Sequence, residues 1–353
     1  MALRTDPAAR STTGATEASA PLVVAAIRGK HEESTHLVHA MVARDDGTLV
    51  AAHGDPGRRT FPRSAVKAIQ ALVLVESGAA DAFGFTPAEL ALACSSHSGT
   101  PLHVDTARSM LAKAGLDATA LECGTHWPID EPSARQLARD GGAPCPLHNN
   151  CSGKHAGFLA AARHLGIPTG GYVAADHPLQ ERVTGTLSDL VGCLLSAADR
   201  ATDGCSIPTH AVPLARLAVA FARVGTGSGL PADRAGALAR LRAAAASHPR
   251  LIAGPGRFDT RVMEACGERV FVKSGAEGVL CAALPDAGIG IAVKAEDGAH
   301  RAAEVAMADL LLRHLPSPSA EERTSLGDLH APALSNWNGV KVGFLAVHVR
   351  RPA

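Results

Sequence analysis

The stretch Arg63-Ser64-Ala65-Val66-Lys67 begins a predicted helix and carries the first indication of the fold. A separation of three residues places the Ser64 hydroxyl and the Lys67 amine on one helix face, one turn apart. Serine attacks a substrate only when a base takes its proton, and a lysine can be that base when burial or a neighbouring cation lowers its pKa. Taken alone, the motif has a plainer interpretation, a helix N-cap followed by a solvated lysine.

A second motif strengthens the first. Lys273-Ser274-Gly275 follows the apolar run Val270-Phe271-Val272. Ser-x-x-Lys at a helix start, followed later by Lys-Ser/Thr-Gly on a strand, is the signature pair of serine β-lactamases and penicillin-binding proteins. Between the two motifs lies Cys94-Ser95-Ser96-His97-Ser98-Gly99, where that architecture keeps its middle serine motif. The alternative for this segment is a Ser-rich loop that bonds its own backbone.

The order of the predicted elements agrees with this architecture. Predicted strands cover 22–27, 37–43, 48–52, 269–273, 278–284, 289–294 and 340–349. Predicted helices cover 64–76, 101–114, 152–165, 178–191, 213–224, 231–246 and 299–314, and a further one follows the capping box Thr86-Pro87-Ala88-Glu89. The Pro- and Ser-rich residues 315–325 predict a surface loop.

These elements predict an α/β (α+β) fold like that of serine β-lactamases and penicillin-binding proteins. Its antiparallel sheet would come from both termini, residues 21–63 and 267–353, with an inserted helical part at roughly 64–266. We expect a single catalytic domain over 21–353 and a disordered tail over 1–20.

The run Asn149-Asn150-Cys151-Ser152-Gly153-Lys154-His155-Ala156-Gly157 packs many reactive groups into one turn, which is typical of a site. Cys151 and Lys154 are three residues apart, and Cys205 lies in Asp203-Gly204-Cys205. Two thiolates with a nitrogen ligand could hold zinc, although lysine is an unusual ligand because its amine must lose a proton. Buried structural cysteines are the commoner outcome.

Composition excludes several classes of partner. Lys+Arg and Asp+Glu both number 34, and only 3% of the 353 residues are aromatic, so neither nucleic acid nor an anionic membrane is expected as a partner. The eight cysteines are scattered singly, which favours reduced thiols. No apolar run approaches the ~20 residues of a membrane span, and residues 1–20 lack the apolar core of a signal peptide. We expect a soluble, cytoplasmic protein.

Together these motifs resemble the asparaginase II family, the class 3 or rhizobial-type L-asparaginases, over nearly the whole chain. The resemblance implies a homodimer that hydrolyses L-asparagine to L-aspartate and ammonia. It also implies two Ser–Lys pairs, Ser64 with Lys67 and Ser96 with Lys273. It places a zinc ion, not essential to the chemical step, on Cys151, Lys154 and Cys205, with His155 and Asp203 close by.

One departure from the family is visible. Well-known members have a cysteine shortly before the strand lysine, where this chain has Arg257-Phe258-Asp259. This puts substrate affinity in doubt more than the chemistry.

We therefore expect an L-asparagine amidohydrolase with a Ser–Lys acyl-enzyme mechanism, in which Ser64 attacks and Lys67 takes its proton. Water then releases aspartate, and Ser96 and Lys273 are expected to relay protons. The side chains and backbone expected to bind the substrate belong to Arg63, His97, Asn150, His155, Ser274 and Gly275. One alternative is a glutaminase or a β-lactam-active hydrolase on the same scaffold. Another is a non-catalytic zinc-dependent binding protein.

Overall fold

The structure, a computed structural model, describes residues 19–348. The disordered tail predicted over 1–20 therefore lies outside the described residues, apart from its last two. Of these, Ser19 forms an isolated parallel bridge with His53. In this part of the chain, none of the helices is long and apolar enough to cross a membrane.

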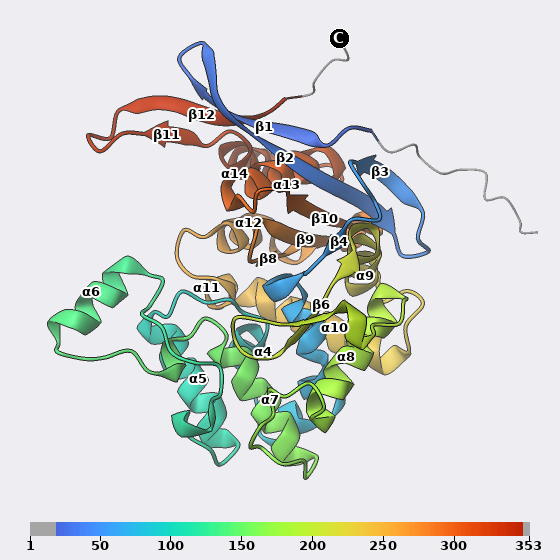
Figure 1. Cartoon of the computed structure of the whole chain (residues 1–353), viewed down its shortest axis with the longest axis vertical. Helices are drawn as coiled ribbons and strands as arrows, with labels where there is room; N and C mark the ends of the chain where they lie inside the picture. The colour runs from blue at the N-terminus through green and yellow to red at the C-terminus, as the bar shows by residue number, and fades with distance from the viewer. Residues whose placement is uncertain (1–18, 349–353) are drawn as a thin grey trace, which may run out of the picture.

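One sheet is assembled from both ends of the described chain (Figure 1). Its strands lie in the order β11-β12-β1-β2-β10-β9-β8, with β3 paired to β2. Every pairing in this sheet is antiparallel. The bounds are β1 (Leu22–Arg28), β2 (His31–Arg44), β3 (Leu49–His53), β8 (Phe271–Gly275), β9 (Val279–Leu284), β10 (Ile289–Ala295), β11 (Ala333–Ser335) and β12 (Lys341–His348). The predicted antiparallel sheet from both termini is confirmed.

The segment between β3 and β8 is mainly helical, as predicted. It contains a 3-10 turn, η1 (Arg63–Val66), followed by α1 (Lys67–Gln70), α2 (Leu72–Glu76), α3 (Ala79–Ala82), α4 (Pro87–Ala93), α5 (Pro101–Lys113), α6 (Glu131–Arg139), α7 (Ser152–His164), α8 (Pro178–Val191), α9 (Leu214–Thr226), α10 (Ala232–Ser247), α11 (Pro249–Ile252) and α12 (Phe258–Cys266). Short strands, β4 (Arg59–Thr60) with β7 (Val212–Pro213) and β5 (Arg200–Thr202) with β6 (Pro208–His210), form two small ribbons. The predicted capping box at Thr86 is present, with Glu89 as its partner.

Two helices cover the sheet. α9 packs against β10, β2 and β9, while α13 (His300–His314) packs against β10, β12 and β2. Gly290 explains the close approach of α9, because a Cβ at this position would lie 2.1 Å from the Ala218 carbonyl oxygen. The central strand β10 is almost completely buried as a result.

Two predictions of local structure need correction. Residues 315–325 were expected to be a loop, but α14 (Ala320–His330) begins within them. Ser319 and Glu322 form a capping box, whose two reciprocal hydrogen bonds satisfy the free N–H groups of the helix start. The helix predicted over 64–76 consists of η1, α1 and α2 in succession.

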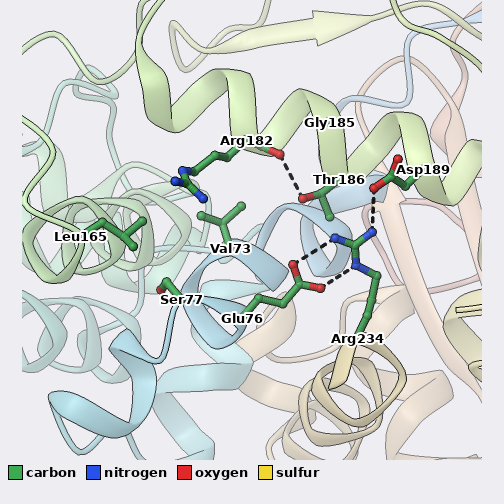
Figure 2. A pocket seen from close by; sticks show the side chains of 9 residues that line it. All are labelled: Val73, Glu76, Ser77, Leu165, Arg182, Gly185, Thr186, Asp189 and Arg234. Carbon is green, nitrogen blue, oxygen red and sulfur yellow. Dashed lines mark hydrogen bonds and ion pairs between the residues drawn. The ribbon is translucent and has the colours of Figure 1, made fainter. Parts of the chain in front are cut away.

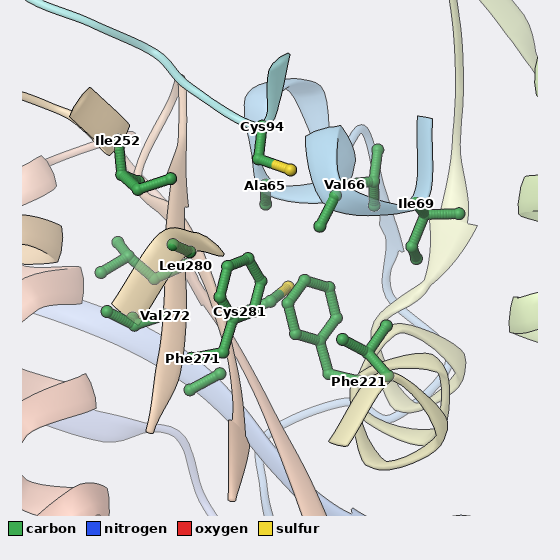
Figure 3. Packing of buried hydrophobic residues seen from close by; sticks show 14 of the residues in the cluster. Ala65, Val66, Ile69, Cys94, Phe221, Ile252, Phe271, Val272, Leu280 and Cys281 are labelled. Atoms are coloured by element: carbon green, nitrogen blue, oxygen red, sulfur yellow. The ribbon is translucent and has the colours of Figure 1, made fainter. Parts of the chain in front are cut away.

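A buried apolar cluster anchors η1 and α1 on the sheet (Figure 3). Ala65, Val66 and Ile69 lie in the same cluster as the side chains of β8 and β9. The rings of Phe221 and Phe271 stack there with centroids 6.4 Å apart. Burying each large side chain contributes about 1.5–3 kcal/mol, so the Ser-x-x-Lys turn is held firmly against the sheet.

Candidate active site

Lys67 is the centre of the candidate site. Its side chain is fully buried, and its Nζ lies 2.6 Å from the Ser95 carbonyl oxygen and 3.0 Å from Ser96 Oγ. The loop before α7 adds Cys151 Sγ at 3.2 Å and the Asn150 carbonyl oxygen at 3.4 Å. One amine thus connects α1 with the loop after α4 and the loop before α7.

The Ser64 hydroxyl has no hydrogen-bond partner among residues 19–348, although its carbonyl oxygen accepts the Lys67 N–H. Ser64 is half-buried, whereas Ser96 is buried. The hydrogen bond of Lys67 therefore goes to Ser96 instead of the expected partner Ser64. The long lysine side chain reaches several oxygen acceptors from other segments, which satisfy its N–H groups better than one hydroxyl on its own turn.

Lys273 lies on β8 and is also fully buried. Its Nζ contacts Asp259 Oδ2 at 3.1 Å and the Ser274 carbonyl oxygen at 2.8 Å, not Ser96 as expected. Burial lowers the pKa of Lys273, the charge of Lys67 lowers it further, and Asp259 partly offsets both effects.

Gly275 brings the two motifs together. A Cβ at this position would lie 2.4 Å from the Pro62 carbonyl oxygen and 3.0 Å from the Ala65 nitrogen. Only a glycine lets the end of β8 lie directly against η1. This close approach places the Lys-Ser-Gly strand beside the Ser-x-x-Lys turn, which is the arrangement that the pair of motifs predicts.

Arg63 has a backbone φ of +50°, a left-handed conformation that non-glycine residues adopt at a cost of about 1–3 kcal/mol. Its Nε donates to Asp203 Oδ1 at 2.6 Å. Burial alone would raise the pKa of Asp203, but the charges of Lys154 and Arg63 and the hydrogen bonds to the carboxylate lower it. Arg63, expected to bind the substrate, is thus engaged by Asp203.

The three expected zinc ligands form one buried group. Lys154 Nζ lies 3.0 Å from Cys205 Sγ, and a hydrogen bond from Cys205 holds the pKa of Cys151 well below its usual value. The same hydrogen bond, together with burial, raises the pKa of Cys205. Burial would lower the pKa of Lys154, but the two sulfur atoms raise it.

Two cysteines and a lysine are a donor set that fits zinc, because deprotonation supplies two thiolates and an amine side by side. Within residues 19–348, no group of three or more His, Cys, Asp or Glu side chains could hold a metal. Any metal held here would therefore require Lys154 as a ligand. All eight cysteines are free thiols.

Both expected substrate-binding histidines are fully buried. His97 contacts Ser152 Oγ at 2.8 Å through Nε2 and accepts the Gly99 N–H at 3.1 Å through Nδ1. Both ring nitrogens are therefore occupied by hydrogen bonds within the chain. His155 Nδ1 lies 2.6 Å from Tyr172 Oη, and its Nε2 has no partner in the described part of the chain. Asn150 accepts a hydrogen bond from Cys151 Sγ at 3.3 Å.

Asp259 is the residue that sequence reasoning missed as a member of the site. In the sequence, Asp259 stands out only as part of Arg257-Phe258-Asp259, the segment in place of a family cysteine. Asp259 lies in the first turn of α12, where the residues three and four positions later, Val262 and Met263, are both buried. That spacing marks Asp259 as belonging to the inward face, and a carboxylate on such a face needs a partner.

A surface pocket of about 400 Å³ lies elsewhere, lined by residues of α2, α8 and α10 (Figure 2). It contains none of the expected site residues. Arg234 donates to both carboxylate oxygens of Glu76 and to Asp189. With Arg182, which also lines the pocket, two arginines balance the two carboxylates, so the pocket presents little that would select a charged ligand.

Comparisons with known proteins extend over most of the chain. The sequence model of a family described as L-asparaginase II matches residues 24–347. Among curated proteins, none matches. Solved structures with similar folds include Mglu in its native form, at 17% identity over 79% of this chain, with a TM-score of 0.44. A β-lactamase from Mycobacterium bovis matches 78% of this chain and 94% of its own, at 18% identity and a TM-score of 0.38. The chain spans 65% of the length of Mglu.

Proposed function

Because this chain belongs to the L-asparaginase II family, we propose that it hydrolyses the side-chain amide of L-asparagine to L-aspartate and ammonia. The observation that carries the proposal is the buried contact between Lys67 Nζ and Ser96 Oγ, next to a second buried lysine on β8. Buried amines beside hydroxyl groups are the equipment of Ser–Lys acyl transfer.

In the proposed mechanism Ser64 is the nucleophile. Its hydroxyl is free of other hydrogen bonds within the described residues and is more exposed than that of Ser96. Ser64 Oγ bonds to the amide carbon while its proton passes to Lys67. The C–N bond then breaks, the nitrogen takes a proton, and ammonia leaves an acyl-enzyme. Water attacks this ester and releases aspartate, with Ser96 passing protons to and from Lys67.

Cys151, Lys154 and Cys205 are the residues that would hold zinc. When bound there, the ion would supply a Lewis acid whose charge is balanced by the two thiolates, and by holding the three side chains together it would tune substrate binding. The attacking group and the base both come from the Ser–Lys residues, so the reaction itself does not require the metal. We also propose a homodimer, which the family resemblance implies, and a cytoplasmic location, which the eight free thiols favour.

The test compares Ser64→Ala, Lys67→Met and wild type for ammonia release from asparagine and glutamine, and for the absorbance change that accompanies ring opening of a chromogenic cephalosporin. We expect asparagine to be the best substrate, and each variant to lose at least ~10²–10⁴ in kcat, the usual effect of removing a general base. Ser95→Ala is the matched control, because the Ser95 hydroxyl is buried and has no partner among the described residues. If Ser64→Ala keeps near wild-type activity, Ser64 is not the nucleophile, and Ser96 takes that role.

If wild type hydrolyses glutamine or the cephalosporin faster than asparagine, the protein is a glutaminase or a β-lactam-active hydrolase instead. Absence of turnover on all three compounds by a folded, zinc-loaded protein would favour a binding protein instead.

A further inference from the structure

Asp259 binds the Lys-Ser-Gly strand through a single oxygen. Its Oδ2 accepts hydrogen bonds from Lys273 Nζ at 3.1 Å, the Ser274 backbone N–H at 3.0 Å and the Ser274 hydroxyl at 2.9 Å. Oδ1 is buried and has no partner among the described residues. Asp259 is 1% exposed and Lys273 is fully buried, so solvent screens their ion pair very little.

The two site lysines differ in their partners. Lys273 is paired with a carboxylate, whereas the acceptors around Lys67 are two carbonyl oxygens, a hydroxyl and the Cys151 sulfur. Lys273 uses two of its three N–H groups, on Asp259 and on the Ser274 carbonyl oxygen. Its third N–H has no partner in residues 19–348.

We propose that Asp259 is a positioning residue that keeps Lys273 as an ammonium ion and fixes its direction. Lys273 then presents a fixed positive charge to the reacting amide oxygen, where negative charge develops, instead of relaying protons. This inference rests on the proposed function for the reaction, but the ion pair itself can be tested without any substrate.

The charges around Lys273 support this role. The lysine faces charged or titratable groups from α1, the end of α4, the segment before α12, and α13; these are Lys67, Cys94, Arg257 and His300. Lys67 and Arg257 lower the pKa of Lys273, as burial does. Glu304 of α13 interacts with Asp259. Among all these groups Asp259 alone is a carboxylate in hydrogen-bond contact with the amine.

Asp259→Asn is a clean variant because Oδ1 has no partner within residues 19–348. The new NH₂ group can take the place of Oδ1 while the amide oxygen keeps its hydrogen bonds to Lys273 and Ser274, so that only the charge is removed. Asp328→Asn, an exposed site on α14, is the control for the loss of one surface carboxylate.

The first measurement is an NMR titration of ¹³C-labelled lysine, which is tractable because the chain has seven lysines. Lys273→Met assigns the resonance. We expect Lys273 to lose its proton at a pH about 1–2 units lower in Asp259→Asn than in wild type, the usual effect of an adjacent opposite charge. An unchanged titration would overturn the proposal, whatever the activity of the protein.

The second measurement is the pH profile of kcat/KM for ammonia release from asparagine. If Lys273 acts as an ammonium ion, activity falls at high pH as it loses its proton, and Asp259→Asn moves this falling limb to lower pH. Asp259→Glu should restore part of the wild-type profile. A shift of the rising limb would make neutral Lys273 the active form, and an equal loss at every pH would make Asp259 merely structural; either outcome overturns the proposal. Failure of wild type to release ammonia counts against the proposed function alone.

Discussion

At the scale of single residues, the protonation of Glu304 should make the free energy of unfolding depend on pH. It lies partly buried on α13, and burial, followed by the negative charge of Asp259, raises its pKa to about 7. In the unfolded chain it ionises near its ordinary value of about 4.5. Between these two pH values the unfolded state has lost a proton that the folded state still holds, so the stability that is present below pH 4.5 is lost as the pH rises through about 7.

Glu304→Gln should remove this pH dependence. We expect the variant to gain about 1–3 kcal/mol in free energy of unfolding, relative to wild type, between pH 5 and pH 8. Urea denaturation of both proteins at the two pH values measures this difference. A difference that stays constant with pH would contradict the raised pKa.

The sequence indicated most members of the candidate site, but it did not indicate their contacts. Ser64, Lys67, Lys273 and the Cys151–Lys154 pair were selected because reactive side chains recur at helical spacing or on a strand end. The contact between Lys67 and Ser96 could not be predicted, since a flexible four-carbon chain can reach acceptors from several distant segments. Asp259 escaped notice because its partner Lys273 lies on a different element.

At the scale of elements, the contact between β8 and η1 depends on Gly275. We expect Gly275→Ala to separate the strand from the turn, reducing the free energy of unfolding by about 1–3 kcal/mol, the usual effect of overpacking, and reducing kcat as Ser64 moves away from Lys273. Thermal melting and ammonia release measure both effects. Gly236→Ala, on α10, is the control, because a Cβ there meets nothing within 4 Å; it should stabilise the helix slightly. If Gly275→Ala melts at the wild-type temperature, the contact between β8 and η1 is easily displaced and this prediction is wrong.

Elements were predicted best where periodicity and caps agreed. The helix predicted at 178–191 has those bounds in the structure, and the three N-terminal strands were all found. The error at α14 came from giving weight to Pro316 and Pro318, although Ser319 and Glu322 already carried the signal of a capping box. α6 was not predicted because none of its residues is buried, although its start carries an Asp130 cap followed by Pro132.

At the scale of the whole molecule, zinc at Cys151, Lys154 and Cys205 would join the start of α7 to the turn before β6. A ligand bound only by the folded chain raises its melting temperature. We therefore expect chelation to lower the melting temperature, and Cys205→Ser to remove this response while Cys193→Ser keeps it. Chelation should also raise KM more than it lowers kcat, because the Ser–Lys residues supply the attacking group and the base. Protein purified without chelator and free of zinc by elemental analysis would contradict the site.

The pairing of β1 with β12 also governs when the molecule can be completed. Val23 lies opposite His348, and both sides of β1 are hydrogen-bonded in the finished sheet. On a ribosome that adds about 5–20 residues per second, β1 waits on the order of tens of seconds for this neighbour. During synthesis its outer edge exposes unpaired backbone groups, a template for joining another chain. The stage most exposed to aggregation is therefore the nascent chain, before β12 emerges.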